Sequence, residues 1–221
     1  MSASASQLLE FDIVSDVVCP WCIIGYRQLQ KALELMAEPP AVVVRWHPFE
    51  LNPQMPEQGQ DVAEHLAQKY GTTPQQSAAA RQRLTTLGES LGFKFDYSPG
   101  MRMVNTFRAH QLLHWGGLEG KQTELKLALF ESFFSLRENV DDINVLVQVA
   151  ERVGLDAAQA RSVMADGRFG SDVRQEQKKW LDRDVHAVPA FVVNQHHMVS
   201  GAQEAETFAR IITKIQAKQV A

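Results

Sequence analysis

Leu8-Leu9-Glu10-Phe11-Asp12-Ile13-Val14, followed closely by Cys19-Pro20-Trp21-Cys22, is the stretch that decides the fold. The first run is typical of a β-strand, and the run after it, residues 23–36, has helical spacing. Cysteines three apart in a first helical turn bring their sulfurs within bonding distance. A helix N-terminus stabilises a thiolate, and Pro20 fits the first helical position. The junction therefore predicts a thiol–disulfide site.

The alternative interpretations of the cysteine pair are weaker. A structural zinc site takes about four ligands, and the chain has only 2 cysteines. A chance pair would leave the preceding strand and the following helix as coincidences. We therefore expect a redox-active Cys19–Cys22 disulfide, no bound metal and no bound cofactor, with glutathione as a possible co-substrate.

Composition excludes several classes of function. The 221 residues are 45% hydrophobic and 22% charged, with a net charge of −4, which is ordinary for a globular protein. No basic cluster suggests nucleic-acid binding, and no apolar run approaches the roughly 20 residues of a membrane span. Residues 1–7 lack the basic start and apolar core of a secretory signal. We expect a cytoplasmic protein, where such a cysteine pair is more often catalytic than structural.

The first fifty residues are expected to form a β-α-β unit. The first strand covers about residues 8–15. The helix after it places one apolar face at helical spacing: Cys22, Tyr26, Leu29, Leu33 and Met36. A second strand is expected over residues 41–46. Its continuous apolar start predicts a strand buried on both faces of a parallel sheet.

The middle of the chain, about residues 61–184, is expected to be almost wholly helical. Thr73-Pro74-Gln75-Gln76 is a typical helix start with a capping box. A helix over residues 104–115 should stop at Gly116-Gly117, and another should begin after Asp142 and end at Gly154. A last helix of this block is expected over about residues 171–182.

Strands return near the C-terminal end. Residues 190–193 and 197–200 flank Asn194-Gln195-His196, which is a hairpin turn signal. A final helix over residues 205–218 follows. The order βαβ, helical block, ββα predicts an α/β thioredoxin fold with a large all-helical insertion. We expect residues 1–60 and 185–221 to form the thioredoxin-like domain and residues 61–184 the helical insertion domain.

Val188-Pro189 stands just before the third strand of this fold. In a thioredoxin fold the proline at this point is cis and lies against the cysteine pair. Its position leaves backbone groups of Val188 free to pair with an extended substrate. The alternative is a proline that merely begins an edge strand.

Four segments together resemble the DsbA-like thioredoxin family, with the FrnE-like branch as the best match. These segments are residues 11–25, Trp46-His-Pro-Phe-Glu-Leu-Asn-Pro53, Val188-Pro-Ala-Phe-Val-Val193 and Val199-Ser-Gly-Ala-Gln203. The resemblance covers nearly the whole chain. It implies a thioredoxin domain with a helical insert and disulfide oxidoreductase or isomerase activity. Kappa-class glutathione transferases and 2-hydroxychromene-2-carboxylate isomerases are similar around Asn52 and Asn105, but have serine in place of Cys19. The branch usually has glycine where this chain has Ala187.

Roles follow for the residues at the site. Cys19 is expected to be the nucleophile, with a pKa below the ordinary value of about 8.5, and Cys22 the buried resolving cysteine. Pro20, Trp21, Val188, Pro189, Phe49 and Asn52 are candidate substrate-binding residues. Asp12 and Asp16 could assist proton transfer from Cys22. His110 and His114 have the spacing of a two-histidine metal site but no third ligand nearby, so we expect them to pack.

Three hypotheses of function remain. The favoured one is a thiol–disulfide oxidoreductase that reduces or isomerises protein or peptide disulfides. The alternative is a glutathione-dependent transferase or isomerase that acts on a small molecule. A third is a chaperone or redox sensor that uses the helical block. No nucleic acid or membrane is expected as a partner, and a homodimer is plausible from the apolar helical block.

Overall fold

A central four-stranded sheet organises the protein, which we describe from a computed structural model covering residues 8–220, with side chains through residue 218. The strand order is β2-β1-β5-β6. The strands are β1 (Leu9–Ser15), β2 (Val42–Pro48), β5 (Ala190–Val193) and β6 (His197–Ser200). β2 pairs with β1 in parallel, whereas β5 is antiparallel to β1 and β6 to β5. This is a mixed α/β thioredoxin fold, as the sequence predicted.

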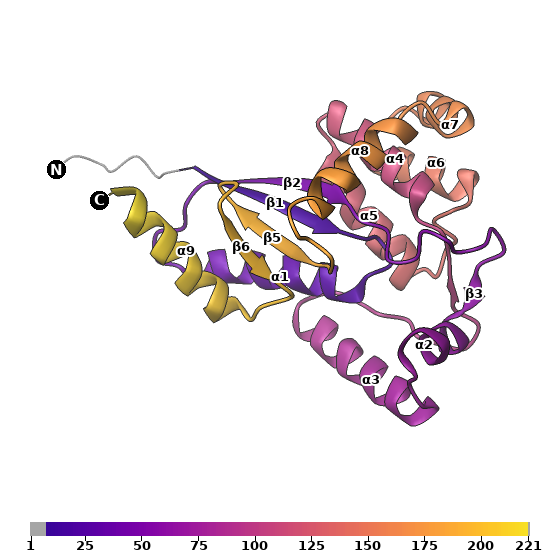
Figure 1. The fold of residues 1–221 in the computed structure, drawn as a ribbon, viewed down its shortest axis with the longest axis horizontal. Coiled ribbons are helices and arrows are strands. Elements are labelled where there is room, and N and C mark those ends of the chain that lie inside the picture. Colours follow the sequence, from indigo (N-terminus) through magenta and orange to yellow (C-terminus); the bar gives the residue numbers. More distant parts are fainter. Residues whose placement is uncertain (1–7, 221) are drawn as a thin grey trace.

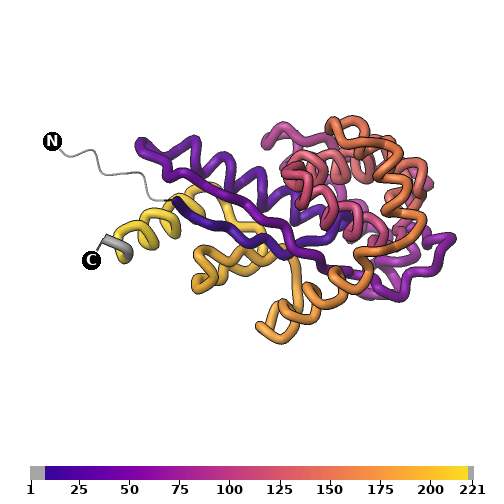
Figure 2. Tube along the Cα trace, turned by 90° about the horizontal axis from the view of Figure 1, so that it is seen from above, coloured from indigo at the N-terminus to yellow at the C-terminus, as the bar shows by residue number. Residues whose placement is uncertain are grey.

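Helices cover both faces of the sheet. Helices α1 (Pro20–Leu35) and α9 (Ala205–Val220) pack together on one face, over the fully buried side chains of Phe191 and Phe208. Helix α8 (Gly170–Leu181) covers the other face, where its Trp180 packs against Val14 and Val192. Helices α1 and α8 therefore lie on opposite sides of the sheet (Figure 2).

The remaining elements gather at the end of the sheet where β1 and β2 terminate (Figure 1). They are β3 (Gln60–Asp61), α2 (Val62–Tyr70), α3 (Pro74–Ser90), β4 (Arg102–Met103), α4 (Phe107–Leu118), α5 (Gln122–Phe134), α6 (Ile143–Arg152) and α7 (Ala157–Asp166). They form two groups: α4 to α7 lie beside β2, and α2 and α3 lie below α1 in the view of Figure 1. Among the described residues, no helix has the length and apolar character needed to cross a bilayer.

Local signals in the sequence were confirmed where they depend on few residues. Thr73 and Gln76 form the expected reciprocal capping box at the start of α3. The Asp142 side chain accepts hydrogen bonds from the backbone at the start of α6. Asn194 and Gln195 adopt positive φ angles of 49° and 62° in the β5–β6 turn, which is the backbone of a tight hairpin.

Three expectations were wrong in part. β2 has alternating exposure and is not buried on both faces; within residues 8–220 it lies at the edge of the sheet beside β1. Helix α4 continues through Gly116 and Gly117 to Leu118. Gly116 does not end the helix; it leaves room for the Leu125 side chain of α5 to approach closely. The middle region also contains a two-stranded ribbon, β3–β4, which is too short for a periodic signal. The division into two domains stays a prediction.

Candidate active site

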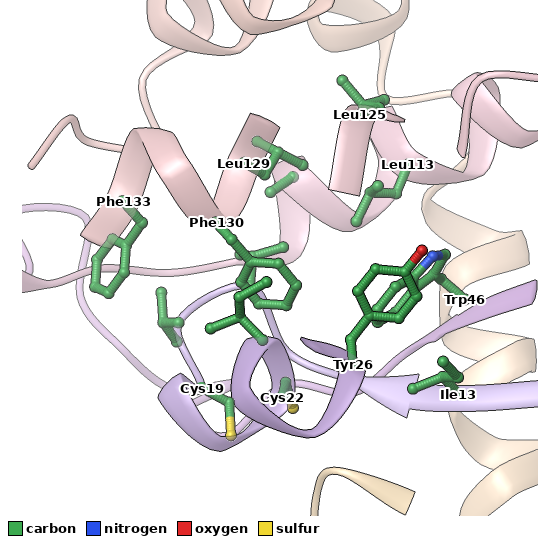
Figure 3. Packing of buried hydrophobic residues seen from close by; sticks show 14 of the residues in the cluster. Ile13, Cys19, Cys22, Tyr26, Trp46, Leu113, Leu125, Leu129, Phe130 and Phe133 are labelled. Carbon is green, nitrogen blue, oxygen red and sulfur yellow. The ribbon is translucent and has the colours of Figure 1, made fainter. Parts of the chain in front are cut away.

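The two cysteines lie at the N-terminus of α1. Cys19 is the N-cap residue and Pro20 begins the helix. The Cys22 N–H donates to the Cys19 carbonyl oxygen at 3.1 Å. Both thiols are free, with exposures of 4% for Cys19 and 0% for Cys22. Figure 3 shows their sulfurs close together in the first turn, with Phe130 and Phe133 of α5 on the opposite side of it.

The loop before β5 closes against Cys19. The Val188–Pro189 peptide bond is cis, as expected. The Cys19 thiol faces the Val188 carbonyl oxygen, with 3.8 Å between sulfur and oxygen. Phe49 packs with Val188 against the cluster around Trp180. Thus the Val188 carbonyl lies at Cys19, and Phe49 lies beside Val188 in the Trp180 cluster. The roles of Val188, Pro189 and Phe49 in substrate binding stay predictions.

The two thiols ionise as a pair. Hydrogen bonding to Cys22 and burial raise the pKa of Cys19 well above its ordinary value. Burial also opposes ionisation of Cys22, but the hydrogen bond from Cys19, the charge of Lys126 and the Ser15 hydroxyl together lower the pKa of Cys22. The lowered Cys19 pKa that the helix N-terminus predicted is therefore wrong for the reduced pair. The first negative charge belongs on Cys22, with Cys19 donating to it.

Asp16 sits behind the cysteines with no exposed surface. It accepts hydrogen bonds from the Leu51 backbone at 2.8 Å and from His110 Nε2 at 3.2 Å. His110 Nε2 also lies 3.0 Å from the Phe49 carbonyl oxygen. Burial opposes ionisation of Asp16, but His110 and Leu51 outweigh it and lower the pKa of Asp16. His110 thus orients the loops around the site. His114, one turn further along α4, packs against the Phe169 ring instead.

Lys126 of α5 is a functional candidate that the sequence analysis missed. Its side chain is only 1% exposed. Its Nζ lies 3.4 Å from the Ser15 carbonyl oxygen and over the rings of Trp46 and Phe130. Burial lowers the pKa of Lys126 to about 8, against the charges of Cys22, Asp16 and Cys19. A lysine on an otherwise apolar helix face was the available signal, but spacing alone could not place it behind the cysteines.

Trp21 projects from the site into a cleft. It is 38% exposed, although a large apolar side chain is usually buried. The cleft has a volume of about 710 Å³ and lies between α1, α3 and the β6–α9 loop. Besides Trp21, its lining includes Ile24, Arg83, Leu87 and Ala202. We call it the Trp21 cleft. Pro20 is half-buried beside it.

Asn52 lies apart from Trp21. Its side-chain oxygen accepts a hydrogen bond from Lys69 Nζ at 2.7 Å, and Lys69 also bonds the Leu51 carbonyl oxygen. Both residues line a second, smaller cleft of about 400 Å³. The structure therefore gives Asn52 a clear role in holding the loop after β2, and substrate contact stays a prediction.

Two tyrosines of the helical region, Tyr70 and Tyr97, respond to the charge of Cys19. Burial and then the charge of a Cys19 thiolate raise the pKa of both Tyr70 and Tyr97. The Tyr97 hydroxyl is buried and has no hydrogen-bond partner among the described residues. Within residues 8–218, no group of three or more His, Cys, Asp or Glu side chains could hold a metal ion.

Comparison with known proteins places this fold and site in a defined class. The model of the DSBA-like thioredoxin domain matches residues 10–213. The chain therefore belongs to the DsbA-like thioredoxin family, which is a family of thiol–disulfide oxidoreductases.

Individual relatives agree with this assignment. The uncharacterized protein YwbO of Bacillus subtilis is 29% identical over 209 residues, which cover 94% of this chain and 97% of YwbO. A probable DsbA oxidoreductase from Streptomyces coelicolor superposes with a TM-score of 0.89 at 31% identity, covering 95% of this chain and 90% of that one.

More distant structures share only the fold. A 2-hydroxychromene-2-carboxylate isomerase has a TM-score of 0.69 at 12% identity, and the match covers 96% of this chain and 99% of the isomerase. The cytosolic disulfide reductase DsbM from Pseudomonas aeruginosa, solved with GSH, has a TM-score of 0.60 at 14% identity, with coverages of 96% and 98%.

Proposed function

We propose that this protein reduces or isomerises disulfides of proteins or peptides through Cys19 and Cys22. One observation carries the proposal: the Cys19 sulfur lies at a helix N-terminus against the carbonyl oxygen of Val188, which precedes a cis-proline. A substrate chain that pairs with the Val188 backbone would bring its disulfide to Cys19. Trp21 and its cleft supply an apolar surface for the flanking residues.

The chemistry takes place in two exchanges. The proton that the two thiols share moves to Cys22, and the Cys19 thiolate attacks one sulfur of the substrate disulfide. That disulfide breaks, a mixed disulfide forms on Cys19, and the first substrate thiolate leaves and takes a proton from water. Cys22 then loses its proton and attacks the Cys19 sulfur. The Cys19–Cys22 disulfide forms, the second substrate thiol leaves, and the substrate has gained two electrons and two protons.

The direction of exchange depends on the surroundings. A pair as oxidising as that of DsbA, about −120 mV, would lie about four decades from a cytosolic glutathione poise of about −240 mV. Such a pair would stay reduced in the cytoplasm. We propose a cytoplasmic reductase or isomerase, regenerated by a low-molecular-weight thiol such as glutathione.

Cys19→Ser and Cys22→Ser test the proposal as a matched pair. The substrate is a peptide with one internal disulfide, labelled so that reduction releases fluorescence, with glutathione as reductant. We expect Cys19→Ser to abolish turnover. Cys22→Ser should accumulate a covalent adduct with the peptide on Cys19, detected by mass spectrometry. Wild-type turnover by Cys19→Ser would refute the proposal.

A second candidate is a glutathione-dependent transferase or isomerase for a small molecule. The Tyr97 hydroxyl favours it: it is buried without a hydrogen-bond partner among the described residues, its pKa responds to the charge of Cys19, and a small ligand on Cys19 could accept its hydrogen bond. This function predicts that Tyr97→Phe weakens glutathione binding about tenfold, the value of one hydrogen bond. It also predicts activity in Cys22→Ser, since one thiol suffices. Loss of peptide reduction with retained glutathione conjugation would favour this candidate.

A further inference from the structure

A third cleft, distinct from the Trp21 cleft and from the cleft at Asn52, lies on the side of the site where Lys126 is found. It has a volume of about 700 Å³ and is bounded by β2, α4, α5 and α8. We call it the rear cleft. Its lining includes Trp46, His110, Gln122 and Lys126. It shares no lining residue with the Trp21 cleft. In Figure 1 the helices around it lie above the sheet strands, whereas α3 of the Trp21 cleft lies below α1.

Lys126 connects the rear cleft with the cysteines. Lys126 lines the cleft, and its amine reaches the Ser15 carbonyl oxygen. Among the described residues Lys126 forms no ion pair, whereas the neighbouring Asp16 is paired with His110. A buried ammonium without a paired carboxylate is costly. The cost falls if a negative charge forms nearby during the reaction.

The groups around Lys126 identify where that charge forms. The charged and titratable groups that act on it are Asp16 from the loop after β1 and Cys19 and Cys22 from α1. His110 of α4 compensates Asp16. The Ser15 hydroxyl is buried and has no other hydrogen-bond partner within the part of the chain that the structure describes, and its hydrogen bond lowers the pKa of Cys22. Lys126 and Ser15 are therefore arranged for a thiolate on Cys22.

We propose that Lys126 is a positioning residue for the resolving step: its amine and the Cys22 thiol share one proton, which exchanges with water through the rear cleft. The inference depends on the proposed function, because it concerns the second exchange. Once a substrate is bound to Cys19, the Cys22 proton passes to the neutral Lys126 amine. The Cys22 thiolate attacks Cys19, the substrate thiolate leaves and is protonated by solvent, and the Lys126 ammonium releases its proton into the rear cleft. The proton can therefore reach water while the substrate still covers the Cys19 side of the site.

Stopped-flow reaction with 5,5′-dithiobis(2-nitrobenzoate) separates the two exchanges. Attack by Cys19 releases the first thionitrobenzoate, and resolution by Cys22 releases the second. We expect Lys126→Met to slow the second phase at least tenfold at neutral pH and to shift its pH midpoint upward by about one unit, with a smaller effect on the first phase. Lys126→Arg keeps the charge but cannot accept a proton, so its second phase should stay slow. Lys121→Met removes an exposed lysine at the start of the same helix and should behave as wild type.

The outcomes distinguish this inference from the proposed function. Absence of the first phase in wild type would count against Cys19 as nucleophile. A normal first phase with an unshifted second-phase pH profile in Lys126→Met would overturn the role of Lys126 alone. If Lys126→Met does not fold, NMR of wild-type protein labelled at lysine Cε replaces it. One lysine should titrate near pH 8, and titration of every lysine in the ordinary range would overturn the inference.

The exit route has its own test. A peptide that is linked to Cys19 by a disulfide and covers the Cys19 face should be released by Cys22. The pH midpoint of this release should equal the midpoint measured for release of the second thionitrobenzoate. A midpoint that shifts with the size of the group on Cys19 would show that the proton leaves through the substrate face instead.

Discussion

The Cys19 sulfur and the Val188 carbonyl oxygen lie 3.8 Å apart although 169 positions separate the two residues in the chain. This contact joins the start of α1 to the loop before β5. It places the backbone that could pair with a substrate beside the reactive sulfur. It also buries Cys19, and that burial helps to keep the thiol protonated in the free protein.

The ionisation of the thiol pair gives the first prediction. Titration of the reduced wild-type protein, followed by thiolate absorbance, should show one thiolate forming below the pH of an ordinary thiol. The second should form well above it, because the first thiolate accepts a hydrogen bond from the remaining thiol. Two thiolates that appear together near the ordinary pKa would contradict the coupling.

Trp21 should determine how well peptides bind. Trp21→Ala removes an exposed aromatic side chain from the Trp21 cleft, so we expect KM for a disulfide peptide to rise about fivefold to tenfold, corresponding to about 1 kcal/mol. The free energy of unfolding should change little. Leu35→Ala, at the exposed far end of the same helix, is the control. An equal effect of the two substitutions would remove Trp21 from the substrate site.

His47 should make stability depend on pH. Its Nε2 and Nδ1 each lie 2.8 Å from a carboxylate, Asp12 and Glu176. Burial opposes protonation, but these two hydrogen bonds outweigh it and raise the pKa of His47, while the His47 hydrogen bond lowers the pKa of Glu176 to about 2. The raised His47 pKa stabilises the folded protein fully at pH values below 6.5, the ordinary pKa of histidine. The lowered Glu176 pKa stabilises it fully at pH values above 4.5, the ordinary pKa of glutamate. The contribution is therefore greatest between these values.

The measurement is urea unfolding of wild type and His47→Leu from acid to alkaline pH. At pH values inside that window the substitution should lower the free energy of unfolding by about 2–3 kcal/mol. The difference should shrink as pH rises through the raised His47 pKa. His196→Leu, in the exposed hairpin turn, controls for loss of a histidine. A difference independent of pH would show that His47 acts by packing alone.

Gly25 should be intolerant of a side chain. A Cβ at this position would lie 2.9 Å from Phe191 Cζ and 3.4 Å from Ala202 Cα. Phe191 is fully buried against Phe208, so it has little room to move. We expect Gly25→Ala to destabilise by about 1–3 kcal/mol, measured by thermal or denaturant unfolding. Gly170→Ala, where the nearest side-chain atom is 3.4 Å away, should be nearly neutral.

The local parts of this structure could be predicted from sequence. The cysteine pair at a strand–helix junction, the Thr73 capping box, the Asp142 cap and the Asn194–Gln195 turn each depend on residues within about four positions of one another. Their energies come from hydrogen bonds and backbone preferences that neighbouring residues already determine. The order of strands and helices followed from these signals.

Only the tertiary structure decided how the site is charged. Lys126 reaches Ser15 across 111 positions, and His110 reaches Asp16 across 94. Neither contact has a periodic or spacing signal, because helix packing brings the side chains together. The edge position of β2 and the effect of Lys126 on the Cys22 pKa likewise depend on which elements are neighbours. The sequence determined which residues can perform disulfide chemistry, and the packing of the helical region against β1 and α1 decided which thiol carries the charge, because burial and distant charges set a pKa.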